Sequence, residues 1–173
     1  MADIKVKYPA VNTTALTITV ASLASTAVGI LLAGRESTAV DNTSTLDLDH
    51  LLSGKIRVGT TPTAARTIEV WAYSAIQIVA AVPTYPDVLD GTDSDETLTS
   101  ASVKVSALRP LWSTAVDATT DRDYFMPQTS IAAAFGDMPP YWGIFITHDS
   151  GVVLNATGSN HFFHFQRIQR QAT

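Results

Sequence analysis

Short runs in which apolar and polar side chains alternate recur along the whole chain, and they constrain its fold more than any other feature. Residues 16–20, 67–73 and 102–107 show the pattern most clearly. Strict alternation is typical of a half-buried β-strand, because successive side chains of a strand point to opposite faces. With further strand-like runs at 46–49, 55–58, 76–82, 141–147 and 161–168, the sequence predicts about eight strands.

Helix signals are scarce by comparison. Only residues 130–136 read as one or two helical turns, with Thr129 or Ser130 as the N-cap and Gly136 as the stop. Many short strands separated by Gly, Pro, Asn and Asp turns predict an all-β sandwich or barrel. We therefore expect a single-domain β-sandwich with at most one short helix, and we prefer a jelly roll to an immunoglobulin-like sandwich.

The 173 residues suit one domain, and neither an internal repeat nor a linker divides them. We expect residues 11–173 to form that domain and residues 1–10 to form an N-terminal arm. Apolar and basic side chains alternate in the arm, so it could add as a strand to the sheet edge of another subunit. The residues that carry this pattern are Ile4, Lys5, Val6 and Lys7.

The charge pattern excludes several classes of partner. The formal net charge is −5, and the Lys and Arg residues are scattered singly, whereas nucleic-acid binding requires clustered cations. Charged residues make up 16% of the chain, against roughly 25% in typical domains. Low charge is also expected of a surface that neighbouring subunits cover. We predict no nucleic-acid partner.

An uncharged stretch between Lys7 and Arg35 is long enough to cross a bilayer, since about 20 residues suffice. Thr and Ser residues interrupt it, however, and residues 16–20 alternate as a strand does. We therefore predict no membrane role.

No set of residues suggests catalysis or a cofactor. The chain has no Cys, which excludes a cysteine nucleophile, a thiolate zinc site and a disulfide scaffold. His161 and His164 would lie on opposite faces of a strand and could not share a metal ion. His148, Asp149 and Ser150 are the residue types of a hydrolase triad, but adjacent residues in a turn point apart. We expect a protein that is not an enzyme and has no cofactor.

Three further features each allow two interpretations. The acidic residues 87–96 could bind calcium, or they could form a solvated turn or a docking surface for basic groups. The aromatic residues could stack on sugars, although core packing is favoured for them. They are Trp71, Trp112, Trp142, Tyr73, Tyr85, Tyr124 and Tyr141.

The third feature is residues 28–32, which are strongly apolar apart from Gly29. They form either a core strand or an exposed loop, and an exposed apolar patch usually marks a protein interface. As a loop, the segment would offer the side chains of Val28, Ile30, Leu31 and Leu32 to a partner.

Several short segments resemble small virion-associated proteins of tailed bacteriophages and prophages. These segments are residues 2–6, 16–19, 21–24, 34–42, 68–73, 141–146, 154–157 and 160–161. They span most of the chain, and residues 28–32 are extra relative to the pattern. None of the segments is a catalytic motif.

The resemblance implies a structural protein of the virion. Head-decoration (cement) proteins are often trimeric β-sandwiches of this size, so we expect a trimer that binds the major capsid protein on the outer surface of the head and stabilises it. The alternatives are a tail, neck or fibre component, or a carbohydrate-binding module. The expected interface residues are Ile4, Val6, Val28, Ile30, Leu31 and Leu32.

Overall fold

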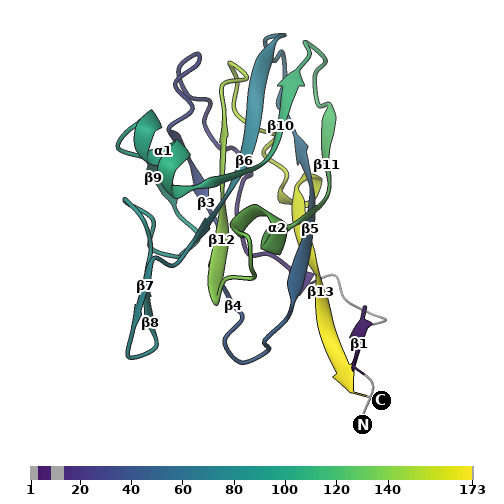
Figure 1. Cartoon of the computed structure of the whole chain (residues 1–173). Coiled ribbons are helices and arrows are strands. Elements are labelled where there is room, and N and C mark those ends of the chain that lie inside the picture. Colours follow the sequence, from purple (N-terminus) through teal and green to yellow (C-terminus); the bar gives the residue numbers. More distant parts are fainter. Residues whose placement is uncertain (1–3, 9–13, 173) are drawn as a thin grey trace.

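A computed structural model describes residues 4–8 and 14–172, and two antiparallel sheets face each other in it (Figure 1). The first sheet has the strand order β1-β13-β5-β11, with β2 added to β13. Its strands are β1 (Ile4–Lys7), β2 (Thr14–Ala15), β5 (Asp49–Arg57), β11 (Asp123–Ser130) and β13 (Phe162–Ala172).

The second sheet has the strand order β10-β6-β12-β3-β9, with β4 added to β12. Its strands are β3 (Ala33–Glu36), β4 (Val40–Asp41), β6 (Arg66–Ser74), β9 (Asp95–Thr97), β10 (Arg109–Val116) and β12 (Tyr141–His148). The chain passes from one sheet to the other six times, between β2 and β3, β4 and β5, β5 and β6, β10 and β11, β11 and β12, and β12 and β13. The predicted all-β sandwich is thus confirmed, while the choice of a jelly roll stays a prediction.

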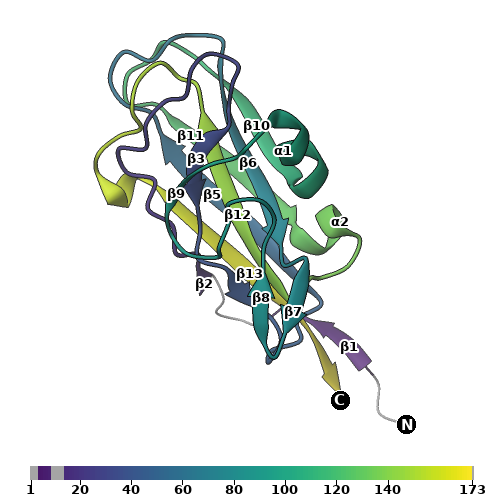
Figure 2. The same ribbon diagram turned by 90° about the vertical axis from the view of Figure 1, so that its left-hand side faces the viewer.

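The remaining elements lie outside the two sheets. A two-stranded hairpin, β7 and β8, projects from the body beside the second sheet, and the short helices α1 and α2 lie near the sheets (Figures 1 and 2). Their bounds are β7 (Gln77–Val79), β8 (Val82–Thr84), α1 (Ala101–Ala107), α2 (Ile131–Phe135) and the 3-10 helix η1 (Gly158–Asn160).

The second sheet is buried on both faces. From β12, Trp142, Ile144 and Ile146 enter the core between the two sheets, whereas Phe145 enters a second core on the other face. That second core also contains Tyr73 from β6, and Tyr85, Leu89, Leu98 and Leu108 from the segment between β8 and β10. The strand predicted at residues 141–147 is confirmed, and its apolar side chains on both faces suit its place in the middle of the second sheet.

The helix prediction was partly right. Ser130 caps α2 by accepting a hydrogen bond from the backbone N–H of Ala133, and Gly136 ends the helix in the left-handed conformation, as predicted. Residues 102–107, however, belong to α1 and not to a strand, so the limit of one short helix was wrong.

The side chain of Lys104 explains the error at α1. Ser100 caps this helix through the N–H of Val103, and the buried residue of the helix is Lys104, while Val105 is exposed. The Lys104 ammonium pairs with Glu69 and lies 4.8 Å from the centre of the Trp71 ring. Because the buried side chain is a lysine, the alternation of Val103 and Val105 predicted the wrong structure.

The alternation at residues 16–20 predicted burial correctly but not pairing. Leu16 and Val20 are buried and Ile18 is half-buried, although β2 ends at Ala15. The backbone of this segment is joined to the sandwich by isolated hydrogen bonds and not by a continuous strand ladder. One example is the bond from the Leu16 N–H to the Phe163 carbonyl (2.9 Å). Likewise, the strand predicted at 46–49 begins only at Asp49.

Candidate interaction surfaces

The β7–β8 hairpin carries four exposed aliphatic side chains. The exposed fractions are 68% for Ile76, 41% for Ile78, 59% for Val79 and 65% for Val82. No charged residue occurs in the sequence between Glu69 and Asp87. Isolated apolar side chains are normal on a protein surface, but a cluster on a projection is typical of a contact site.

The turn of the hairpin explains why the sequence did not reveal it. Ala80 and Ala81 both have positive φ angles, 49° and 65°, as a two-residue type I′ turn requires. Such turns usually contain Asn or Gly. Residues 76–82 were therefore expected to be one continuous strand, and no glycine marked its reversal.

Residues 28–32 form a loop that leads into β3, and they are not a core strand. Val28 is 61% exposed and Ile30 is 55% exposed. Leu31 is half-buried, and Leu32 packs against the second core. The exposed apolar surface of the loop thus comes from Val28 and Ile30 only.

Hydrogen bonds hold this loop at both sides of its apolar tip. The N–H of Gly29 donates to Asp149 Oδ2 (3.0 Å), and the ammonium of Lys104 donates to the carbonyl of Leu31 (2.8 Å). The N–H of Leu98 donates to the carbonyl of Leu32 (3.0 Å). A contact made by this tip would need little further ordering of the loop, and preorganisation favours binding.

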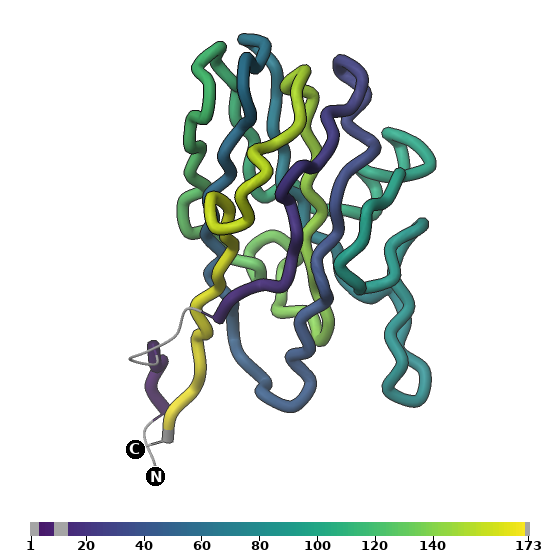
Figure 3. The backbone as a smooth tube through the Cα atoms, turned by 180° about the vertical axis from the view of Figure 1, so that it is seen from behind, coloured from purple at the N-terminus to yellow at the C-terminus, as the bar shows by residue number. Residues whose placement is uncertain are grey.

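Ile4 and Val6 lie on β1, and their side chains are 70% and 60% exposed. The strand pairs with β13 of the same chain, so the expected addition to a neighbouring subunit is not the pairing that the structure shows. Residues 1–3 and 9–10 of the predicted arm lie outside the described residues. Figure 3 places β1 at one end of the molecule and residues 28–32 at the other.

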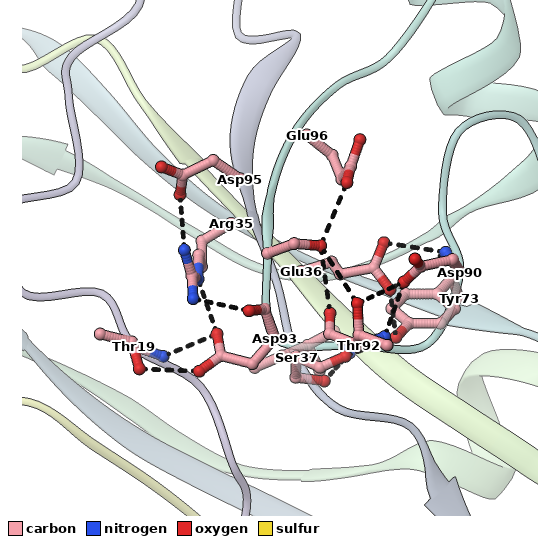
Figure 4. A network of polar contacts seen from close by, with 12 residues as sticks. Thr19, Arg35, Glu36, Ser37, Tyr73, Asp90, Thr92, Asp93, Asp95 and Glu96 are labelled. Atoms are coloured by element: carbon pink, nitrogen blue, oxygen red, sulfur yellow. Dashed lines mark hydrogen bonds and ion pairs between the residues drawn. The ribbon is translucent and has the colours of Figure 1, made fainter.

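Hydrogen bonds within the protein occupy most carboxylates of the acidic segment 87–96 (Figure 4). Arg35 Nε donates to Asp93 Oδ1 (2.6 Å) and Arg35 Nη1 to Asp95 (3.1 Å), while the Thr19 hydroxyl donates to Asp93 Oδ2 (2.7 Å). Within residues 4–8 and 14–172, no group of three or more potential ligands is arranged to hold a metal ion. The geometry thus argues against a calcium site and leaves the solvated turn and the docking surface as the two interpretations.

The carboxylate of Glu36 lies under this segment and is fully buried. It accepts hydrogen bonds from the N–H groups of Gly91 (2.5 Å) and Asp90 (3.2 Å to Oε2). Burial raises the pKa of Glu36 to about 7, although these N–H groups favour the ionised form. Glu36 therefore fixes the backbone of the acidic segment from below.

His148 and Ser150 contact each other but do not form a catalytic triad. His148 Nδ1 lies 2.9 Å from Ser150 Oγ, whereas Nε2 lies 3.1 Å from the carbonyl of Leu23 instead of a carboxylate. Both residues are completely buried, and burial lowers the pKa of His148 to about 4. The carboxylate of Asp149 accepts hydrogen bonds from the N–H groups of Gly29 and Thr67. This arrangement stabilises loops and gives a substrate no access.

The tryptophans do not form a sugar platform. Trp142 is fully buried, and Trp71 and Trp112 are half-buried against the two cores. Two phenylalanines do lie on one open sheet face: Phe125 (64% exposed) and Phe162 (40% exposed). Both pair with Lys55, from opposite sides of β5, so the three side chains form one row.

No protein-family model matches the chain, and no curated protein matches it. Among the helices of the described residues, none is long and apolar enough to cross a membrane.

Proposed function

We propose that the protein is a structural subunit of a bacteriophage virion, and that it stabilises the head by binding the major capsid protein on the outer surface of the lattice. The observation that carries this proposal is the set of exposed aliphatic side chains on ordered projections: the β7–β8 hairpin and the tip formed by Val28 and Ile30. Burying one such side chain stabilises a contact by about 1.5–3 kcal/mol. The resemblance of the short segments to virion-associated proteins supports a bacteriophage virion as the particle to which the protein binds.

Binding to purified particles tests the proposal. Heads and tails of the phage that encodes the chain are separated, and each is sedimented with the added protein. We expect the protein to sediment with heads stripped of it. Binding to tails alone would assign it to the tail, neck or fibre, and binding to neither would contradict the proposal.

A pair of variants links the binding to the hairpin. Ile78→Ser/Val82→Ser removes two aliphatic side chains from the hairpin and should reduce head binding at least tenfold, since a few central residues usually dominate an interface. Val105→Ser/Val153→Ser is the matched control, because these valines are 63% and 51% exposed but lie outside the projections. Equal binding by both variants would exclude the hairpin from the contact.

The row Phe125, Lys55 and Phe162 favours a second candidate, a carbohydrate-binding module. Aromatic rings two strands apart are separated by about 9.5 Å, which is enough for adjacent sugar rings to stack on them. A glycan array should then detect ligands for the wild-type protein and none for Phe125→Ala/Phe162→Ala. No glycan bound by the wild type would reject this candidate.

A further inference from the structure

A two-stranded ribbon extends from one end of the molecule. The pairing of β13 with β5 ends at Ile168, opposite Asp49, and beyond that point β13 pairs with β1 from Gln169 to Ala172. Figures 1 and 2 show β1 and the end of β13 projecting away from the sandwich. A ribbon of two strands cannot cover its own faces and is only marginally stable alone.

The ribbon is basic and apolar. Residues 4–8 and 169–172 contain three cationic side chains and no acidic one. The cations, Lys5, Lys7 and Arg170, are exposed. On the same strand, Ile4 and Val6 are exposed, and Tyr8 just beyond it is 60% exposed.

The opposite side of the molecule offers a complementary surface at β9. This three-residue strand ends the second sheet among the described residues, since it pairs with β3 alone. Asp87, Asp90, Asp93, Asp95 and Glu96 lie on or just before it, and Arg35 is the only cation that pairs with them in the described structure. The side chain of Asp95 is 75% exposed.

A hollow beside β9 is lined by apolar and acidic residues together. Its lining includes Leu23, Ala24, Ala33 and Gly34 together with residues 95–97. The exposed tip of Val28 and Ile30 leads directly into β3, which forms part of this lining. Long basic side chains suit such a hollow, because their methylene stems cover apolar surface while their charged ends meet carboxylates.

We propose that the β1–β13 ribbon of one copy docks against the acidic β9 edge and adjoining hollow of a second copy. The inference deepens the proposed assembly role and rests on it. A sheet edge offers unpaired backbone groups, and charge on the edge decides which strand can join it. The acidic β9 repels a second β9, and the basic β1 repels a second β1, whereas the two attract each other.

The placement of the two surfaces determines the kind of assembly. Because β1 lies at the lower right of the molecule in Figure 1 and β9 at its upper left, one copy cannot join both surfaces with itself. The contact is head-to-tail, and such contacts give closed rings when the rotation between copies closes. A trimer is one such ring.

Charge reversal tests the contact by sedimentation velocity at micromolar concentration. Lys5→Glu/Lys7→Glu reverses the ribbon, and Asp95→Lys/Glu96→Lys reverses the edge. We expect the wild type to form closed oligomers and each variant alone to be a monomer. A mixture of the two variants should assemble again with the two variants alternating, because each ribbon then meets an edge of opposite charge on the other variant.

Three further variants complete the test. The chain with all four reversals should assemble again, since the charges are complementary once more. Arg66→Glu/Arg109→Glu and Asp117→Lys/Asp137→Lys, which change the same charges elsewhere, should leave the oligomer unchanged. Oligomers that persist in both reversed variants would overturn the proposal, as would a monomeric wild type.

Head binding is measured on the same samples, so the two proposals fail separately. A wild-type monomer that binds heads would overturn the head-to-tail contact and leave the proposed function standing. Oligomers that show the expected charge dependence but bind no phage particle would support the contact and contradict the proposed function.

Discussion

The interior between the two sheets and the projections at the periphery use their side chains in opposite ways. In the interior, polar groups are paired with one another, and within the described residues no buried side-chain nitrogen or oxygen lacks a hydrogen-bond partner. At the periphery, aliphatic side chains of the β7–β8 hairpin and of β1 face solvent without a covering layer.

A chain of hydrogen bonds shows how the interior is held. Trp142 Nε1 on β12 donates to His50 Nδ1 on β5 (2.9 Å), so the His50 proton lies on Nε2 and faces Asp47 Oδ2 (2.9 Å). Arg167 Nε on β13 donates to the same oxygen (2.6 Å). Burial alone would raise the pKa of Asp47, but hydrogen bonds from Arg167, His50 and Gln169 lower it to about 2. The chain joins the two sheets.

This comparison shows that the exposed apolar side chains do not reflect a poorly packed interior. The projections are then available for contacts with other molecules, and changes in the two regions should have separable effects.

The largest effect on stability is expected from His50→Leu. This change leaves the buried Trp142 N–H without its acceptor and removes one of the two hydrogen bonds to Asp47 Oδ2, which keeps the one from Arg167. We expect the free energy of unfolding to fall by about 3 kcal/mol, measured by urea denaturation. His164→Leu, on the open face of β13, should change it by no more than about 0.5 kcal/mol. Similar losses in both variants would contradict the assigned role of the network.

The next effect concerns Glu36 and depends on pH. Because its folded-state pKa is about 7 and its unfolded value is near 4.5, the neutral carboxyl favours folding most below pH 4.5. That contribution is lost as the pH rises through 7. Glu36→Gln should therefore gain stability relative to the wild type between pH 5 and pH 8, by about 1–3 kcal/mol. A difference that does not vary with pH would show that Glu36 is ionised throughout.

A smaller effect is expected at the turn of the hairpin. Ala80→Asn/Ala81→Gly supplies residues that tolerate positive φ, so it should stabilise the hairpin by about 0.5–1 kcal/mol. Amide hydrogen exchange of β7 and β8 should become slower while exchange in β5 and β12 stays the same. Faster exchange in the hairpin would contradict the turn geometry.

The smallest effect on stability is expected at the tip of residues 28–32. Val28→Ser/Ile30→Ser removes exposed side chains and should change the free energy of unfolding by less than about 0.5 kcal/mol. Self-association or head binding should weaken all the same. A large loss of stability, measured as a lower melting temperature, would show that these side chains are part of the core.

The sequence predicted the sandwich because period-two alternation reports burial directly, as β6 illustrates. It failed where a side chain departs from its usual role. Lys104 is buried through an ion pair, so α1 was mistaken for a strand. Ala80 and Ala81 adopt positive φ without glycine, so the β7–β8 hairpin was not foreseen.

The interface candidates depended on contacts that a sequence does not show. The segment 28–32 could equally have been a strand until its bonds to Asp149, Lys104 and Leu98 placed it as a loop. The partner of β1 could not be derived either, because strand pairing between distant segments depends on the whole fold. The acidic residues 87–96 were evident, but not that Arg35 and Glu36 fix them in place.

Hydrogen–deuterium exchange of the free protein and of the protein bound to phage heads tests the central claim most directly, namely that the projections make the contacts and the interior does not. We predict that binding slows exchange in β7–β8, in β1 and in residues 27–32, and leaves β5, β6 and β12 unchanged. Slower exchange across the sandwich strands, with the projections unaffected, would contradict the account.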